Sequence, residues 1–233
     1  MKTIKKNTTK FSLSIIMFII TISIHSQTSP EDEIGAWYML DGTHKVLDKL
    51  SIKTGFQLRS FEVSDNINLL LYYTGIKYNL SKKTTLTLVY CYLDIDKTFL
   101  VTGKNHLYES RPYEQISYKQ EIYNFPVNHR LRLEHRFLNY KKQHTILHRF
   151  RYRIGTKINL NKTIFIKVNE EIFVNLKDQV FTENRLFTAL GYNLSKSSNI
   201  QLGYLNHEIN KQNLNRLQVG LFIKTDLRKK KQH

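Results

Sequence analysis

Two neighbouring segments hold the residues of this sequence that are best suited to binding anions. Residues 130–137 read RLRLEHRF and residues 148–158 read HRFRYRIGTKI, so that a charged side chain recurs at almost every second position. Arginine presents a planar fork of N–H donors that matches carboxylate and phosphate oxygens. The chemistry offered by these segments is therefore anion recognition, together with ion pairs to the few acids among them.

The period of two predicts that both segments are β-strands. Successive side chains of a strand point to opposite faces, so the charges share one face and the hydrophobic residues share the other. In a soluble sheet, rows of like charge placed directly opposite one another are destabilising. A polar lumen inside a lipid-facing wall accommodates the pattern better, which favours a membrane β-barrel.

Three similar turns organise the rest of the chain. Residues 78–84, 158–163 and 192–198 share an Asn-Leu-Ser/Asn-Lys core between alternating segments. Short polar turns of this kind are typical of the periplasmic end of a bacterial outer-membrane barrel. The longer connections then lie at the other end, where residues 95–112 are expected to form the longest extracellular loop.

Alternation between the turns predicts ten strands, at residues 50–61, 67–80, 84–94, 113–123, 128–138, 145–160, 163–175, 184–194, 198–206 and 214–226. An even number keeps both ends of a single-chain barrel in the periplasm. Residues 34–41 leave three alternatives open: an eleventh partner at the periplasmic rim, half of an extra hairpin that makes twelve strands, or an inward plug. Glu170 falls on the lipid side, so either a bulge at 169–171 resets the register or the faces of that strand are assigned wrongly.

The first 26 residues have the composition of a secretory signal peptide. Four lysines precede the apolar run 11–24, and small or polar residues follow at 26–29. We expect cleavage near Ser26, with Gln27 as the new N-terminus. The apolar run is shorter than the roughly 20 residues that a spanning helix needs, which argues against a signal anchor. Export and an outer-membrane location follow.

Charge and cysteine content narrow the class of protein. The formal net charge is +17 and falls to +13 without residues 1–26, which hold four lysines and no acids. An excess of basic residues suggests nucleic acid as a partner. No nucleic-acid-binding motif is visible, however, and export separates the chain from that partner. The lone Cys91 allows no internal disulfide, so hydrogen-bonded strands must hold the fold together.

Pairing the two arginine-rich segments in one hairpin defines the predicted site. Aligning their apolar faces sets Glu134 opposite Arg149, Arg132 opposite Arg151 and Arg130 opposite Arg153, and the next hairpin sets Arg153 opposite Glu171. Two interpretations stay open. The charges either fill a narrow lumen and fix the strand register, or they bind or conduct small anions. The predicted lumen charges are Arg130, Arg132, Glu134, Arg136, Arg149, Arg151, Arg153, Glu171 and Arg185.

Two histidines of the same hairpin fall on its outer face. His135 and His148 are expected to pair near the extracellular rim, below Lys141 and Lys142. They are either ordinary interface residues or contacts to the phosphates of lipopolysaccharide. Two histidines lack the further ligand that a metal ion needs, so we predict neither a metal site nor a cofactor.

Catalysis is the alternative from another functional class, because some small outer-membrane barrels are lipases or acyltransferases. Ser110, His106 and Glu109 fall in the predicted long loop. No nucleophile elbow, His-Glu-x-x-His helix or phosphate-binding loop accompanies them. We expect ordinary polar loop residues here and no enzyme.

Several short motifs follow one another along the chain after the export signal: Trp37-Tyr38, Gln57-Leu58-Arg59, the segments 130–137 and 149–155, Glu171-Ile172-Phe173, Asn184-Arg185-Leu186 and Leu202-Gly203-Tyr204. This order resembles the Bacteroidota outer-membrane barrel family catalogued as domain of unknown function 2490. The resemblance covers nearly all of the chain after the export signal. It implies location and fold but brings no known reaction. The chain departs from the usual terminal aromatic residue by ending in Leu227 and a basic tail.

The sequence thus predicts an all-β fold, a closed antiparallel transmembrane β-barrel of about ten strands, with twelve as the alternative. Its parts are a signal peptide at 1–26, an N-terminal periplasmic segment or extra strand at 27–49, the barrel at 50–227 and the basic tail at 228–233. Expected partners are outer-membrane lipid and lipopolysaccharide, the barrel-insertion machinery and a small anionic ligand. The expected role is structural, binding or that of a narrow anion-preferring pore; the alternative is a lipid-modifying enzyme.

Overall fold

The computed structural model describes residues 33–98, 105–177, 181–209 and 211–228, and the regular elements in these residues are all β-strands. They are β1 (Ile34–Lys45), β2 (Leu50–Ser60), β3 (Ile67–Asn79), β4 (Thr84–Asp96), β5 (His106–Ile122), β6 (Phe125–Tyr140), β7 (Gln143–Asn159), β8 (Ile164–Asn175), β9 (Phe181–Asn193), β10 (Ser198–Ile209) and β11 (Gln212–Asp226). No helix in this part of the chain is long and apolar enough to cross a membrane. The predicted signal peptide and residues 229–233 of the basic tail lie outside the described residues.

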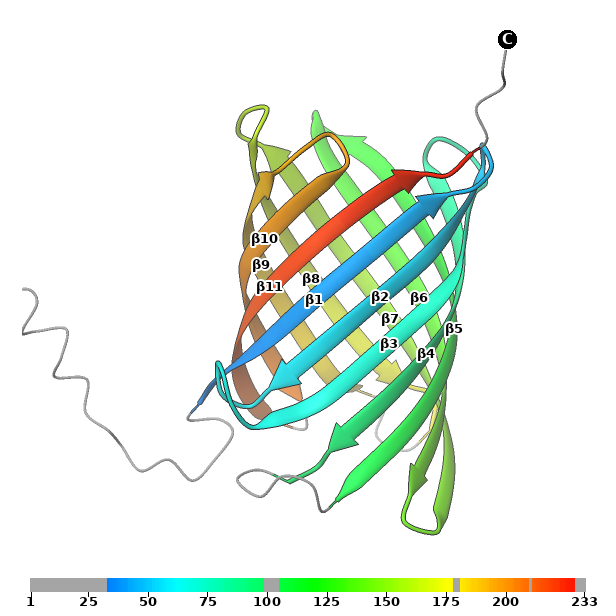
Figure 1. Ribbon diagram of the computed structural model, residues 1–233, viewed down its shortest axis with the longest axis vertical. Helices are drawn as coiled ribbons and strands as arrows, with labels where there is room; N and C mark the ends of the chain where they lie inside the picture. The colour runs from blue at the N-terminus through cyan, green and yellow to red at the C-terminus, as the bar shows by residue number, and fades with distance from the viewer. Residues whose placement is uncertain (1–32, 99–104, 178–180, 210, 229–233) are drawn as a thin grey trace, which may run out of the picture.

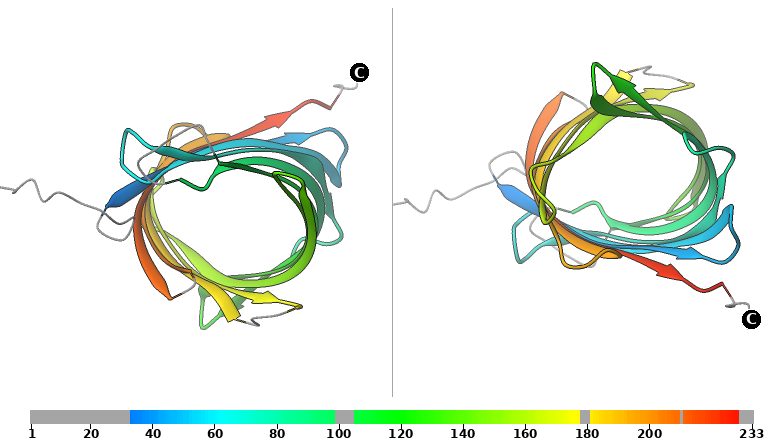
Figure 2. Two further views of the ribbon diagram at one scale, coloured as in Figure 1. Left: turned by 90° about the horizontal axis from the view of Figure 1, so that it is seen from below. Right: turned by 90° about the horizontal axis from the view of Figure 1, so that it is seen from above.

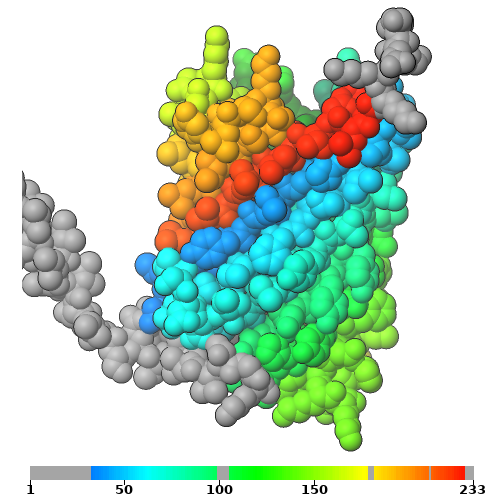
Figure 3. All heavy atoms as spheres, viewed as in Figure 1, coloured from blue at the N-terminus to red at the C-terminus, as the bar shows by residue number. Residues whose placement is uncertain are grey.

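The sheet closes into a barrel because β1 pairs with β2 on one side and with β11 on the other. The pair of β1 and β11 is parallel, with Leu40 opposite Leu221, whereas the other neighbouring pairs are antiparallel. Figures 1 and 3 show the first strand (blue) and the last strand (red) side by side. The predicted closed β-barrel is therefore confirmed, with eleven strands in place of the ten expected. Residues 34–41 belong to β1, which is the additional strand. This is the first of the three alternatives left open for them, an eleventh partner, but β1 pairs with its neighbours along its length and is not confined to a rim.

The parallel seam corrects the prediction that both ends of the barrel chain lie on the same side. Since β1 and β11 run in the same direction, the start of β1 and the end of β11 stand at opposite ends of the barrel (Figure 1). The prediction of an even number of strands rested on the assumption that all neighbouring strands are antiparallel. One parallel pair removes that requirement, because an odd number of strands then closes without leaving an unpaired edge.

The connections between strands sort into two ends, which we call the turn end and the loop end. The turn end carries the connections β1–β2, β3–β4, β5–β6, β7–β8 and β9–β10, and the loop end carries the others (Figure 1). Views along the barrel show the strands as a ring around the lumen (Figure 2). The three related turns lie together at the turn end and the connection from β4 to β5 lies at the loop end, as predicted.

A polar side chain in each related turn satisfies the backbone there, which explains why the motif recurs. Ser81 Oγ accepts hydrogen bonds from the backbone N–H groups two and three residues later, at 3.1 and 2.9 Å. Asn161 Oδ1 does the same at 2.8 Å for both groups. Ser195 Oγ accepts from the N–H group two residues later at 3.1 Å. A tight turn leaves some backbone N–H groups without backbone acceptors, and these side-chain oxygens accept their hydrogen bonds instead.

The predicted strand positions agree with the observed ones to within three residues at each end, except around the longest connection. β4 continues to Asp96 and β5 begins at His106, so both strands extend into the predicted loop at 95–112. The prediction is therefore wrong for residues 95–96 and 106–112, which are parts of strands. Residues 106–112 are rich in charged residues, as a loop often is. Their charged and apolar side chains also alternate, however, and this segment pairs with β4 as part of β5.

Side chains alternate between a polar lumen and an apolar outer surface. On β9, Phe187 and Ala189 are buried inside the barrel, whereas Leu186 and Leu190 lie 47% and 58% exposed on the outside. β8 keeps one continuous register with β7 and β9 past residues 169–171, so neither the bulge nor the reversed faces considered there are found. Glu170 points outward, between two residues that line the lumen.

Cross-linking tests the parallel seam. With Cys91 replaced by serine, the double variant Leu40→Cys/Leu221→Cys should form a disulfide, because these residues are direct partners and adjacent strands lie about 4.8 Å apart. The control Leu40→Cys/Leu217→Cys moves the second thiol roughly 13 Å along the strand and should stay reduced. Gel mobility without reductant and mass spectrometry of linked peptides report the result. Cross-linking of the control alone would contradict the seam.

Candidate functional site

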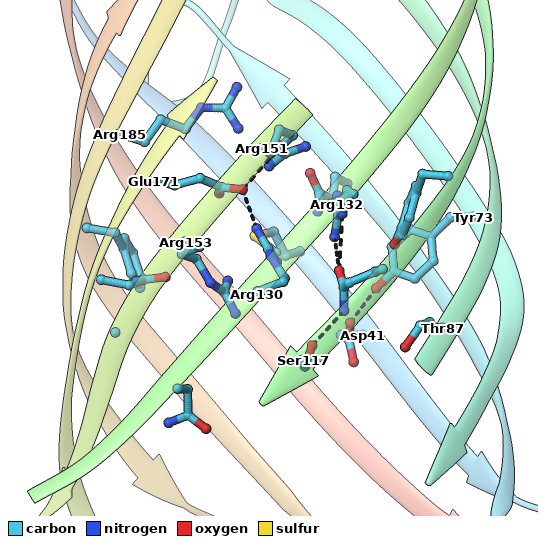
Figure 4. A pocket seen from close by; sticks show the side chains of 18 of the residues that line it. Asp41, Tyr73, Thr87, Ser117, Arg130, Arg132, Arg151, Arg153, Glu171 and Arg185 are labelled. Carbon is cyan, nitrogen blue, oxygen red and sulfur yellow. Dashed lines mark hydrogen bonds and ion pairs between the residues drawn. The ribbon is translucent and has the colours of Figure 1, made fainter. Parts of the chain in front are cut away.

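The lumen holds the charged side chains of the arginine-rich segments. β6 and β7 pair in the expected register, with Glu134 opposite Arg149, Arg132 opposite Arg151 and Arg130 opposite Arg153, and β8 sets Glu171 opposite Arg153. Figure 4 shows several of these side chains pointing into the barrel. The predicted lumen charges, Arg136 and Arg185 included, all line one interior cavity of about 1370 Å³.

Glu134 is fully buried at the centre of a network of ion pairs. Its Oε2 accepts hydrogen bonds from Nε and Nη2 of Arg149, at 2.9 and 2.7 Å. Its Oε1 accepts from Arg151 at 2.5 Å and from Arg132 at 3.4 Å. A buried carboxylate is costly unless close cationic donors compensate for lost hydration. Here three guanidinium groups from the β6–β7 hairpin do so, which also fixes the register of that hairpin.

Two further carboxylates extend the network to β8, β9 and β10. Glu171 Oε1 accepts from Arg130 at 2.5 Å and from Arg151 at 2.9 Å. Glu183 accepts from Arg149 at 3.1 Å, pairs with Arg185 and contacts His207 Nε2 at 2.6 Å. Each carboxylate is thus shared among several cations, so the network links five neighbouring strands.

Four glutamates are buried among the described residues, and sequence analysis missed two of them as lumen residues, Glu109 and Glu183. Glu109 accepts from Arg111 at 2.5 Å and from Arg136 at 2.7 and 2.9 Å. Both glutamates stand before the predicted strand starts at 113 and 184. Each is separated by one residue from an arginine that faces the same way. That spacing is the signal that would have extended both strands.

Aromatic rings hold guanidinium groups in the same part of the lumen. Arg59 lies over the ring of Trp37 at 3.7 Å, and Arg185 lies 4.9 Å from it. Phe173 is fully buried beneath Arg151 and Arg185, at 4.3 and 4.5 Å. The face of an aromatic ring attracts a cation, most strongly where both are removed from water. Arg59, which forms no ion pair with the described residues, is stabilised in this way.

A smaller polar cluster joins β1 to β2 and β3. Asp41 accepts hydrogen bonds from Lys53 Nζ and from the hydroxyl of Tyr73. Gly55 lies between Asp41 and Tyr73 in the strand register. A Cβ atom at Gly55 would stand 2.1 Å from the Tyr73 ring. Glycine therefore lets the tyrosine lie across the neighbouring strand and reach Asp41.

The half of the lumen nearer the turn end is rich in lysine. Lys77, Lys119, Lys157 and Lys167 stand close to the turn-end limits of their strands and line the cavity. Among the described residues that line it, the acids other than Asp41 belong to the arginine network. The lumen is therefore divided into a paired arginine–glutamate half and a lysine half with little counter-charge, which sequence analysis did not anticipate.

The two histidines predicted to pair on the outer face are in contact. Nδ1 of His135 lies 2.8 Å from Nδ1 of His148, and Nε2 of His135 lies 3.1 Å from Glu114 Oε2. Lys141 and Lys142 form the adjoining turn between β6 and β7. The carboxylate of Glu114 was not expected, and it competes with an anionic phosphate for His135. Contact with lipopolysaccharide stays a prediction.

The residues considered for catalysis do not converge on one point. Glu109 faces the lumen, whereas the Ser110 hydroxyl accepts a hydrogen bond from Tyr90 on the outer face at 2.9 Å. His106 contacts Asp94 at 2.5 Å. Within the part of the chain that the structure describes, no group of three or more His, Cys, Asp or Glu side chains is arranged to hold a metal ion.

One protein-family model matches residues 34–218, from the start of β1 into β11. The chain belongs to this family, described as protein of unknown function (DUF2490). The resemblance noted in the sequence is thus confirmed at the level of the family. No curated protein and no solved structure shows a significant match to the chain. The arginine–glutamate network of this DUF2490 protein lies entirely within the matched residues.

Replacing the central carboxylate tests the network. Glu134→Gln should lower the free energy of unfolding in detergent by about 3–5 kcal/mol, because the buried guanidinium groups lose their shared counter-charge. Glu170→Gln is the matched control: it removes an outward-facing carboxylate that forms no ion pair with the described residues, and should change stability little. Equal melting midpoints for wild type and Glu134→Gln would contradict this account.

Proposed function

We propose that this DUF2490 protein is an integral outer-membrane β-barrel whose basic lumen binds small anions and admits them in preference to cations. The observation that carries the proposal is the surplus of positive charge inside the barrel. Ten arginines and seven lysines line the cavity among the described residues, against four acids. Rings of arginine and lysine lower the energy barrier for anions and raise it for cations.

The outer surface supports a lipid environment for the barrel. Leucine, isoleucine and tyrosine side chains project from the wall, with Leu88 and Leu202 each 60% exposed. A soluble monomer rarely exposes contiguous apolar patches beyond a few hundred Å². A closed barrel satisfies its backbone internally, which is the condition for strands in hydrocarbon. The signal peptide expected at 1–26 supplies the export route, so the outer membrane is the proposed location.

The packing of the lumen favours a narrow passage or a binding chamber over a wide channel. Glu109 and Glu134 have no exposed surface, and Phe173 is equally buried. Side chains therefore occupy much of the arginine–glutamate half. Anions approaching from the lysine half meet ammonium groups that form no ion pair with the described residues, such as Lys77 and Lys119, before they reach this network. The proposal assigns no catalytic role to the barrel.

Lipopolysaccharide, outer-membrane lipid and the barrel-insertion machinery remain the proposed macromolecular partners. His148 lies on the outer wall of the β6–β7 hairpin, and Lys141 and Lys142 form the turn of the same hairpin at the loop end. Cationic and hydrogen-bond-donating groups at that level suit an anionic leaflet. If the turn end faces the periplasm, as its short turns favour, these residues lie at the outer leaflet.

Ion selectivity tests the proposal. Purified protein in a planar bilayer under a potassium chloride gradient should show a reversal potential that favours chloride. The double variant Lys77→Gln/Lys119→Gln should weaken the preference, because it removes lumen charges that form no ion pair with the described residues. The control Lys162→Gln/Lys196→Gln removes equal charge from exposed turns at the same end. Cation preference, or an equal effect of both variants, would contradict an anion-selective lumen; absence of conductance would limit the lumen to binding.

A further inference from the structure

Arg130 and Arg153 bring two guanidinium groups together in the middle of the lumen. They are direct partners across β6 and β7, and Figure 4 shows them side by side. The neighbouring carboxylate of Glu171 accepts its hydrogen bonds from Arg130 and Arg151. Arg153 makes no hydrogen bond and no ion pair with the described residues. Like charges placed directly opposite one another destabilise a strand pair. One carboxylate, Glu171, stands against both guanidinium groups: it pairs with Arg130 and lies opposite Arg153 across β7 and β8. Because Glu171 also pairs with Arg151, the positive charge here exceeds the negative charge.

Lys167 adds a third cation on β8. It lines the same cavity, and its strongest charge interactions are repulsions from Arg153 and then from Arg130. The acid that acts on it, Asp41, is already engaged by Lys53 and the hydroxyl of Tyr73. Lys167 itself forms no hydrogen bond or ion pair with the described residues; its Nζ lies 5.7 Å from each of two aromatic rings.

The side chain of Asn169, which carries no charge, points to the same part of the lumen as a binding site. Asn169 lies between Lys167 and Glu171 on the lumen face of β8 and is only 8% exposed. Its Nδ2 is buried and has no hydrogen-bond partner among the described residues, and the same holds for Nε of Arg130. A Cβ atom at Gly155, the residue opposite, would stand 2.5 Å from Cβ of Asn169, so glycine makes the room that the amide occupies.

All of these side chains are hydrogen-bond donors, and an acceptor that carries negative charge would satisfy them together. Buried donors nearly always find a partner, so each exception has a physical cause, and a bound ion is one such cause. We propose that Arg130, Arg153, Lys167 and Asn169 form a binding site for a phosphate-type oxyanion. Several oxygens on one centre satisfy donors that arrive from β6, β7 and β8, which a spherical chloride ion does less well. The site rests on the proposed anion-binding function and gives it a location and a ligand class.

Thermal unfolding in detergent with inorganic phosphate tests the site, with chloride at equal ionic strength as the reference. Phosphate should raise the melting midpoint of the wild type, because a ligand that binds only the folded state stabilises it. Arg153→Gln should melt at or above the wild-type midpoint without phosphate, since it relieves repulsion and breaks no ion pair. Its affinity for phosphate, measured by calorimetry, should fall by about tenfold or more, the equivalent of one charge-assisted contact.

Two further variants separate the site from general charge effects. Asn169→Ala keeps every charge and should also weaken phosphate binding, and it carries the test if Arg153→Gln does not fold. Lys77→Gln removes a lumen charge outside the site and should keep the phosphate response. Glycerol 3-phosphate in place of phosphate distinguishes a site for phosphate monoesters from one for the free ion.

Two results would overturn the site: no stabilisation of the wild type beyond the chloride reference, or an equal response of all variants. If either result is found and the bilayer experiment still shows an anion-preferring conductance, the phosphate site is refuted and the proposed function is not. Cation-preferring conductance would refute the proposed function instead, so the two failures are distinguishable.

Discussion

A β-strand with an unpaired edge exposes a row of backbone donors and acceptors, and in hydrocarbon such an edge has no partners at all. The chain removes its last two edges by pairing β1 with β11 in parallel. The rest of the molecule depends on that closure, because only a closed sheet has an inside in which charge is separated from the outer surface. The seam strand also contributes to the interior: its Trp37 lies beneath Arg59, and its Asp41 binds Lys53 and Tyr73.

Inside the barrel, carboxylates are scarce, and each glutamate of the arginine network serves several cations. Glu134 contacts three arginines, and Glu171 and Glu183 join the same network to the next strands. Sharing of this kind gives each of these acids more than one cation, while some lumen cations form no ion pair with the described residues. Aromatic faces compensate part of the deficit, as Phe173 does beneath Arg151. The remainder, centred on Arg153 and Lys167, is the chemical basis for proposing that the lumen takes up anions.

Much of this arrangement could be predicted from the sequence, because period-two alternation reports which face a side chain occupies. The register of the β6–β7 hairpin followed from aligning apolar faces, since a shift by one residue would turn every charge outward. The parallel seam could not be predicted, because alternation carries no information about strand direction or about which strands meet at closure. Glu109 and Glu183 were missed because charged residues near a strand end have the same composition as a loop. The unpaired donor of Asn169 depends on three-dimensional neighbours and has no signature in the sequence.

The central claim is that the apolar face of every strand meets lipid while the charged face encloses a lumen. Nitroxide labels placed one at a time at residues 186–190 of β9, with Cys91 replaced by serine, report this directly in phospholipid bilayers. Labels at 186, 188 and 190, the outward positions, should collide readily with oxygen, which concentrates in hydrocarbon, and rarely with a water-soluble nickel complex. Labels at 187 and 189 should show low accessibility to oxygen. Higher nickel than oxygen accessibility at the outward positions would contradict a lipid-facing wall.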